Sequence, residues 1–310
     1  MAVVVAAGAL ALAGCGTTTG STTGSAARQD GGTAIDVVAT TPVVADFVRN
    51  VGGGRVHVDQ ILKPGLDPHD YEPSPADVQA IADADVVVKS GVGLEHWLDD
   101  TVSSSGYGGQ VVDSSHGVTI RPGDSADPMG DPHIWHDPAD ASIMVGNIAA
   151  ALESKDPAGA ATYQKNATAY QAQLAALDAR DKAEIASIPA AQRQLVTNHD
   201  AFGYYCARYG ITFVGSIIPS FDSSAELSGK ELSDLVTRIK QTGVRAVFSE
   251  SSLPPKTAQT VAQEAGVQVV GGEDSLFADG LGPVGSPGGT YLGAERHNTD
   301  TIVKALGGRV

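Results

Sequence analysis

Histidine side chains follow several of the predicted strands of this chain, in loops that could bind a metal ion. His69 lies in the proline-rich segment KPGLDPHDYEPSPAD, and His199 lies in LVTNHDAFGYYCARYG. The segment DPHIWHDP carries His133 and His136, three residues apart. Imidazole nitrogens are preferred ligands of zinc and of neighbouring transition metals. Because open α/β sheets bind their ligands at the loops that follow the strands, these positions predict a shared site.

Each of these residues also has an ordinary structural explanation. An isolated histidine such as His69 is usually solvated, and His199 follows Asn198, a potential helix cap. Spacing alone does not decide which histidine of DPHIWHDP is a ligand. The segment GGEDSLFADGLG offers two aspartates, Asp274 and Asp279, and loop aspartates are common. The residues by themselves therefore leave the ligand set open.

The elements that must position these loops follow an alternating pattern. Apolar β-branched runs (IDVVATT, VHVDQIL, DVVVKSG, GQVVDSS, then RQLVTN, ITFVGSI, VRAVFSE, VQVVGG) alternate with helical patterns. Ser74 is placed to cap one of these helices, and Ser228 with Glu231 has the spacing of a capping box. Such alternation predicts βαβ units around mainly parallel sheets, which is an α/β fold.

A long helix is expected to divide the chain into two α/β lobes. Residues 156–188 are rich in Ala, Gln, Leu and charged residues and are bounded by Pro157 and Pro189. This composition predicts one helix with a proline in its first turn and another just past its end. We therefore expect an N-terminal lobe at 34–155 and a C-terminal lobe at 189–310, each a mainly parallel sheet flanked by helices, with the metal site between them.

The overall composition narrows the classes of partner. The chain has 310 residues and a formal net charge of −16, which repels nucleic acid and suits cationic ligands. Its two cysteines, Cys15 and Cys206, are too few for a disulfide framework. Cys206 lies in an aromatic helix and is expected to be a small buried hydrophobic residue. A metal site here must rest on histidines and carboxylates.

The N-terminal residues predict a lipoprotein. Residues 1–15 are apolar and end in Leu-Ala-Gly-Cys, which resembles the bacterial lipobox, in which cleavage precedes a lipid-modified cysteine, here Cys15. No Lys or Arg precedes the apolar segment, unlike in most signal peptides. Residues 16–33 are mostly Gly, Ser, Thr and Ala and are expected to form a flexible tether. The mature protein would be anchored by lipid at the outer face of the cytoplasmic membrane, in the cell envelope or periplasm.

Taken together, the motifs closely resemble those of the metal-specific solute-binding lipoproteins of ABC importers, a family that binds zinc or manganese. The segment containing His69 matches a P-H-x-Y-E-P-x-P loop, and His133 matches the histidine of D-P-H-x-W. The phrase V-T-x-(H/E)-x-A-F-x-Y places the third ligand at His199. The resemblance covers nearly the whole chain after the tether, in the right order, and leaves His136 as an extra imidazole.

The resemblance also orders the two aspartates. The family pattern F-x-D-S-I with a tyrosine twelve residues later is similar to Phe277-Ala278-Asp279-Gly280-Leu281 with Tyr291. It therefore implies Asp279 as the fourth ligand, with Asp274 as the alternative. His116 is the only histidine in the segment before DPHIWHDP, where zinc members often have a histidine-rich loop. His116 and His136 remain possible accessory ligands, and His297 is expected at the surface or in packing.

Three histidines and one aspartate imply Zn²⁺ as the cargo rather than Mn²⁺. A tetrahedral set of this composition suits a d¹⁰ ion, whereas manganese prefers more oxygen ligands and its family members usually have Glu at the position of His199. Affinity order alone would also admit copper and nickel. Because imidazole binds metal only when deprotonated, release is expected as pH falls.

The implied function is capture of zinc outside the membrane and delivery to the permease of an ABC importer, by a monomer with modest lobe movement. A zinc chaperone is a possible further partner. A zinc enzyme is a rival, but four protein ligands close the coordination sphere and no H-E-x-x-H motif is present. An adhesion or scaffold lipoprotein with structural zinc is a second rival. Metal removal would unfold that protein, whereas a receptor would stay folded.

Overall fold

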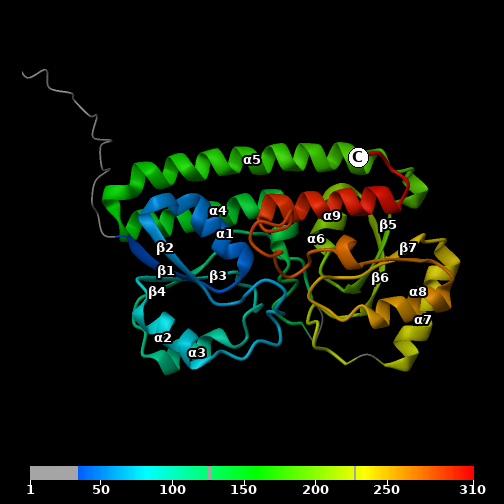
Figure 1. Ribbon diagram of the computed structural model, residues 1–310, viewed down its shortest axis with the longest axis horizontal. Helices are drawn as coiled ribbons and strands as arrows, with labels where there is room; N and C mark the ends of the chain where they lie inside the picture. Colours follow the sequence, from blue (N-terminus) through cyan, green and yellow to red (C-terminus); the bar gives the residue numbers. More distant parts are fainter. Residues whose placement is uncertain (1–33, 124–126, 227) are drawn as a thin grey trace, which may run out of the picture. The chain divides into compact units, whose positions relative to one another are not determined.

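Four parallel strands carry the loops of the first half of the chain (Figure 1). The computed structural model describes residues 34–123, 127–226 and 228–310, so the expected signal peptide (1–15), its Cys15 and the tether (16–33) lie outside the described residues. The sheet has the order β2-β1-β3-β4. Its strands are β1 (Ile35–Ala39), β2 (Val56–Gln60), β3 (Val86–Lys89) and β4 (Gln110–Asp113).

Successive residues of the central strands point to opposite faces of this sheet, and each face packs against its own group of helices. Val37 and Val88 pack against one group of helices, while Val38 and Val87 pack against the other. This alternation follows from the two-residue period of a strand, and burial on both faces explains the nearly continuous apolar runs. The first group includes α1 (Pro42–Gly52) and α4 (Pro138–Lys155), and the second comprises α2 (Pro75–Asp83) and α3 (Leu98–Ser105).

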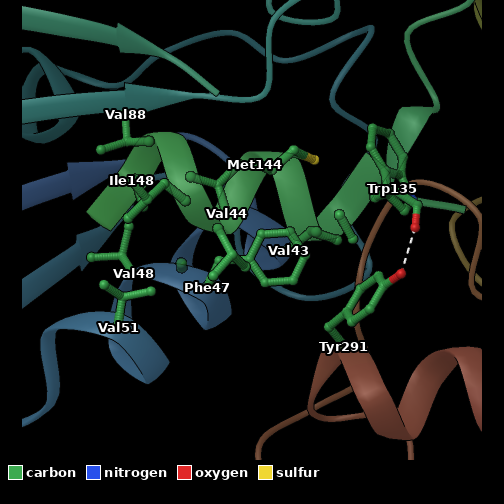
Figure 2. Packing of buried hydrophobic residues seen from close by; sticks show 14 of the residues in the cluster. Val43, Val44, Phe47, Val48, Val51, Val88, Trp135, Met144, Ile148 and Tyr291 are labelled. Carbon is green, nitrogen blue, oxygen red and sulfur yellow. Dashed lines mark hydrogen bonds between the residues drawn. The ribbon is translucent and has the colours of Figure 1, made fainter. Parts of the chain in front are cut away.

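The core on the α1 and α4 face reaches from the sheet to the last helix of the chain (Figure 2). Val44, Phe47 and Val48 of α1 interdigitate with Met144 and Ile148 of α4. All of these side chains are buried. This contiguous apolar contact holds α4, and the segment that leads into it, firmly against the sheet.

The second half contains two parallel strand pairs, β5 with β6 and β7 with β8, and β5 lies beside β7. Its strands are β5 (Gln194–His199), β6 (Thr212–Ile218), β7 (Ala246–Phe248) and β8 (Gln268–Val270). Its helices are α6 (Gly203–Tyr209), α7 (Gly229–Thr242), α8 (Lys256–Ala265) and α9 (Tyr291–Ala305). The predicted capping box of Ser228 and Glu231 is confirmed at the start of α7, and Ser74 caps α2 as expected.

The long helix α5 (Ala160–Ala186) packs against helices of both halves. In Figure 1 it runs above α4 and α9, and its buried residues recur every three to four positions, from Tyr163 to Ile185. Pro157 lies in a separate 3-10 turn, Pro157–Gly159, so the helix starts later than the composition indicates. The α/β fold with parallel sheets, flanking helices and one long helix is confirmed.

Candidate metal centre

His69 lies on the loop that follows β2, in the expected proline-rich segment. Its backbone N–H donates to Asp67 Oδ1 at 2.9 Å, and Oδ2 of the same carboxylate accepts a hydrogen bond from Ser223 at 2.5 Å. The ring is partly buried, and its Nε2 atom is buried without a hydrogen-bond partner. An imidazole nitrogen left in this state is available to a cation.

His133 lies at the start of the 3-10 turn Ile134–His136, immediately before α4. Its ring is fully buried, and its Nδ1 atom lies 2.9 Å from Asp131 Oδ1. Arg121 pairs with the other oxygen of Asp131. Because Nδ1–H donates a hydrogen bond to the carboxylate, the lone pair of the neutral ring is placed on Nε2.

His199 is the last residue of β5 and is held in the same way. Its Nδ1 atom lies 2.5 Å from Glu250 Oε2, and its backbone N–H donates to Glu250 Oε1 at 3.0 Å. Both residues are buried, and Glu250 follows the adjacent strand β7. A strand end and a carboxylate from the neighbouring strand thus set both the position and the tautomer of this ring.

Asp279 lies in the loop after β8, and its carboxylate lies beside the Nε2 atoms of both His133 and His199. Its Oδ1 atom is 3.2 Å from His133 Nε2 and 3.2 Å from His199 Nε2. The residue is buried, and neither carboxylate oxygen accepts a hydrogen bond. A buried carboxylate with free lone pairs is costly unless a cation or proton is bound beside it.

The four side chains converge on one point. One ligand atom from each of His69, His133, His199 and Asp279 lies within 4.8 Å of all the others. The Nε2 atoms of His133 and His199 are 3.3 Å apart. Ligands about 2.0–2.1 Å from a tetrahedral ion are separated by about 3.3–3.4 Å, so the spacing of the His133 and His199 nitrogens is close to that of two ligands of one such ion. A site of three histidines and one aspartate that could hold a metal ion is therefore present.

Asp279 and the rings of His133 and His199 shift one another's pKa values, with the carboxylate and the rings each favouring the charged form of the other. Burial lowers the pKa of His133, but the interactions with the carboxylates of Asp131 and Asp279 outweigh it and raise the pKa to about 9. The pKa of His199 is raised well above its usual value, since Asp279 and Glu250 outweigh burial. The pKa of Asp279 is lowered well below its usual value because the two rings outweigh burial. The centre is built to hold positive charge.

His69 behaves differently from the other two histidines. Burial, together with the nearby His133 and His199, lowers the pKa of His69 to about 3, although Asp279 opposes the shift. A cavity of 430 Å³ opens beside this ring and is lined by residues that include His96, Met129 and Asp222. His69 therefore borders both the cluster and the cavity.

The other predicted candidates lie outside the cluster. Both ring nitrogens of His136 have protein partners, Glu295 and the carbonyl of Ala278. His116 is exposed, and Asp274 is exposed in the 3-10 turn Gly272–Asp274. The structure thus brings together the four residues that the resemblance implied and leaves these three apart.

Two other candidates keep the packing roles expected for them. The ring of His297 bonds to the carbonyl of Ser275 and packs edge-on against Phe277. Cys206 is a buried free thiol.

Sequence reasoning missed the two carboxylates behind the rings. Asp131 could have been found, because it precedes His133 by two residues and its carboxylate also accepts the His133 backbone N–H. Glu250 carried only its position just after a predicted strand, and its partner is 51 residues away. Long-range pairs of this kind have no local signal.

Comparisons with known proteins identify the family. The model of the family "Zinc-uptake complex component A periplasmic" matches residues 37–305. The chain belongs to this family, whose members are substrate-binding proteins rather than enzymes.

Individual relatives in this family differ in the metal that their names carry. The chain is 36% identical to the manganese-binding lipoprotein MntA of Bacillus subtilis, over 96% of this chain and 95% of the relative. It is 34% identical to the iron-binding protein YfeA of Yersinia pestis, over 87% and 86%. The solved structure of the periplasmic zinc-binding protein TroA from Treponema pallidum superposes with a TM-score of 0.82 at 33% identity, covering 88% of this chain and 99% of TroA. The family is shared, whereas the metal varies among its members.

Proposed function

We propose that this protein captures Zn²⁺ outside the cytoplasmic membrane and delivers it to the permease of an ABC importer. The ion would be bound by His69, His133, His199 and Asp279 and is the cargo of the protein rather than a resident cofactor. The observation that carries the proposal is the convergence of these four ligand atoms within 4.8 Å. Three imidazoles and one carboxylate favour zinc over manganese, which prefers more oxygen ligands.

Transport, rather than a structural role for the metal, is supported by the way the site is built. Its ligands come from loops and strand ends of both halves of the fold, and each half also has an apolar cluster of its own that contains none of the ligands. We therefore expect the metal-free protein to stay folded. We further propose that residues 34–155 and 189–310 act as two lobes joined by the 156–188 segment, with modest movement on metal binding.

Location and partners follow from the N-terminal residues and the relatives. We propose that Cys15 is lipid-modified and becomes the first residue of the mature chain after cleavage of the segment before it, with 16–33 as a tether to the outer face of the membrane. Relatives are named as lipoproteins, including MntA. Among the described residues no helix has the length and apolar character needed to cross a bilayer. Mass spectrometry of the protein purified from membranes tests whether residue 15 carries diacylglycerol.

Calorimetric titration of the metal-stripped protein with Zn²⁺, Mn²⁺ and Fe²⁺ tests the function. We expect one tight zinc site per chain, weaker manganese and iron binding, and loss of the tight site in Asp279→Ala. Asp274→Ala is the matched control, because it removes an exposed aspartate from the neighbouring turn. Tighter binding of manganese or iron than of zinc would overturn the metal assignment. Absence of stoichiometric binding of any of the three would overturn the function.

A further inference from the structure

His136 is buried beneath the metal centre, and both of its ring nitrogens are engaged. Nδ1 lies 2.8 Å from Glu295 Oε1, and Nε2 lies 3.0 Å from the carbonyl oxygen of Ala278. A carbonyl oxygen only accepts, so Nε2 carries a hydrogen and donates it to Ala278 wherever the proton between Nδ1 and Glu295 resides. The ring also stacks on Phe202 with centroids 4.5 Å apart. The imidazole is therefore held at two edges and on one face.

The bond from His136 to Ala278 joins two segments that each carry a ligand. His136 is the last residue of the 3-10 turn that starts next to His133, and Ala278 directly precedes Asp279. Trp135 Nε1 donates to the same carbonyl at 3.0 Å. Two adjacent side chains thus fix the peptide next to Asp279, whose Oδ1 atom lies 3.2 Å from His133 Nε2.

One face of α9 holds both segments. Tyr291, Glu295 and Asn298 are spaced four and three residues apart, which places them on the same side of the helix. Tyr291 donates to the carbonyl of Trp135 at 2.6 Å (Figure 2), and Glu295 pairs with His136. Asn298 accepts the backbone N–H of Phe277 and donates to its carbonyl. This helix therefore connects the turn beside His133 with the loop of Asp279.

We propose that His136 and Glu295 are positioning residues that set the place of Asp279 relative to His133 in the metal centre. The inference rests on the proposed metal-binding function. Core packing alone does not account for the pair, because apolar side chains of similar volume stabilise a buried site as well as or better than a buried ionisable pair. A ligand carboxylate, in contrast, needs its position fixed to about 0.5 Å, which directional hydrogen bonds provide.

Two variants of nearly equal shape test the inference. His136→Gln and His136→Met both remove the imidazole and leave Glu295 in place, but only glutamine can donate a hydrogen bond to the Ala278 carbonyl. Zinc affinity is measured by chelator competition, and Co²⁺ is bound to each variant to record its visible spectrum, which reports ligand geometry. We expect His136→Met to bind zinc about tenfold more weakly, with an altered Co²⁺ spectrum, as other outer-shell changes do. His136→Gln should stay within about threefold of the wild type on the same scale.

Further variants separate positioning from stability. His136→Met/Glu295→Met removes the carboxylate that the single change leaves without its partner, and it serves if His136→Met does not fold. It should show the same weakened zinc binding and altered spectrum. Tyr163→Phe is the control for general loosening, because it removes the hydrogen bond of a buried tyrosine to Asp156 at 2.9 Å without involving α9 or either ligand segment. It should bind zinc as the wild type does.

Each outcome decides one question. Equal zinc affinities and equal Co²⁺ spectra for His136→Gln and His136→Met would overturn the positioning role while leaving the metal site intact. Equal loss of affinity in Tyr163→Phe and His136→Met would also overturn it, because general loosening would then explain the effect. A wild-type protein that binds no metal would instead overturn the proposed function itself.

Discussion

The metal centre has two sides that hold their histidines in different ways. His133 and His199 are both 0% exposed, and each has a buried carboxylate behind its ring, Asp131 or Glu250. His69 lies on a loop beside a cavity, and its environment lowers its pKa to about 3. A carrier must bind its ion selectively and also release it. We infer that His133 and His199 set which ion is bound, whereas the loop of His69 lets the ion enter and leave.

Removing one histidine from each side tests this division most directly. We expect His199→Ala to weaken zinc binding about a thousandfold, because it deletes a held ligand and leaves Glu250 buried without its partner. His69→Ala should weaken zinc binding about thirtyfold, since a ligand on a loop must be ordered when metal binds. Calorimetry of both variants gives the ratio. Equal losses would break the comparison, and Asp274→Ala serves as the shared control.

A buried carboxyl group, Asp181, lies on the long helix α5, and its pKa is raised. Burial raises the pKa of Asp181 on α5 to about 7, and Glu295 adds to the shift, while Arg180 opposes it. Burial, together with the charge of Asp181, also raises the pKa of the Tyr205 and Tyr209 hydroxyls. Because the folded pKa is above the unfolded value of about 3.9, the free energy of unfolding should decrease as pH rises from about 4 to 7.

Asp181→Asn should abolish this decrease, making the variant about 2–3 kcal/mol more stable relative to wild type at pH 8 than at pH 4. Urea unfolding of the metal-free proteins across this range measures the difference. Asp178→Asn is the control with the opposite sign. Arg208 lowers the pKa of Asp178, so its contribution to stability is present above the unfolded pKa and is lost as pH falls. A pH-independent difference between Asp181→Asn and the wild type would contradict the prediction.

The carboxylate behind His199 can be tested without removing a ligand. In Glu250→Gln, one amide oxygen cannot accept both the backbone N–H and the Nδ1–H of His199 in the present geometry. If the amide nitrogen faces Nδ1, the proton moves to Nε2 and blocks the metal-binding lone pair. We expect zinc affinity to fall about 10- to 100-fold by chelator competition. Glu273→Gln changes an exposed glutamate nearby and should have no effect; equal affinities for both variants would remove the role of Glu250.

The alternation of strands and helices could be predicted from the sequence because the periods of strands and helices repeat within a few residues. Ser74 and Ser228 could be predicted as caps because a cap acts on residues only three positions away. Spacing alone did not decide whether His133 or His136 is the metal ligand, and only the family motif favoured His133. Their difference depends on partners far along the chain: Nε2 of His133 faces Asp279, whereas His136 pairs with Glu295, 159 residues away. Such pairs arise from packing of α9 and therefore have no signature in spacing.

The loop side makes the smallest prediction. Asp67 accepts the backbone N–H of His69 and the hydroxyl of Ser223, which comes from the second half of the fold. Ser223→Ala should therefore free the His69 loop and speed zinc release about threefold, as expected for loss of one hydrogen bond of about 0.7 kcal/mol. Stopped-flow chelation measures the rate. Ser224→Ala is the matched control, because among the described residues the Ser224 hydroxyl bonds within its own loop, to Asp222. Faster release in both variants would show that the whole 219–225 loop, rather than the link to Asp67, controls the exit of the ion.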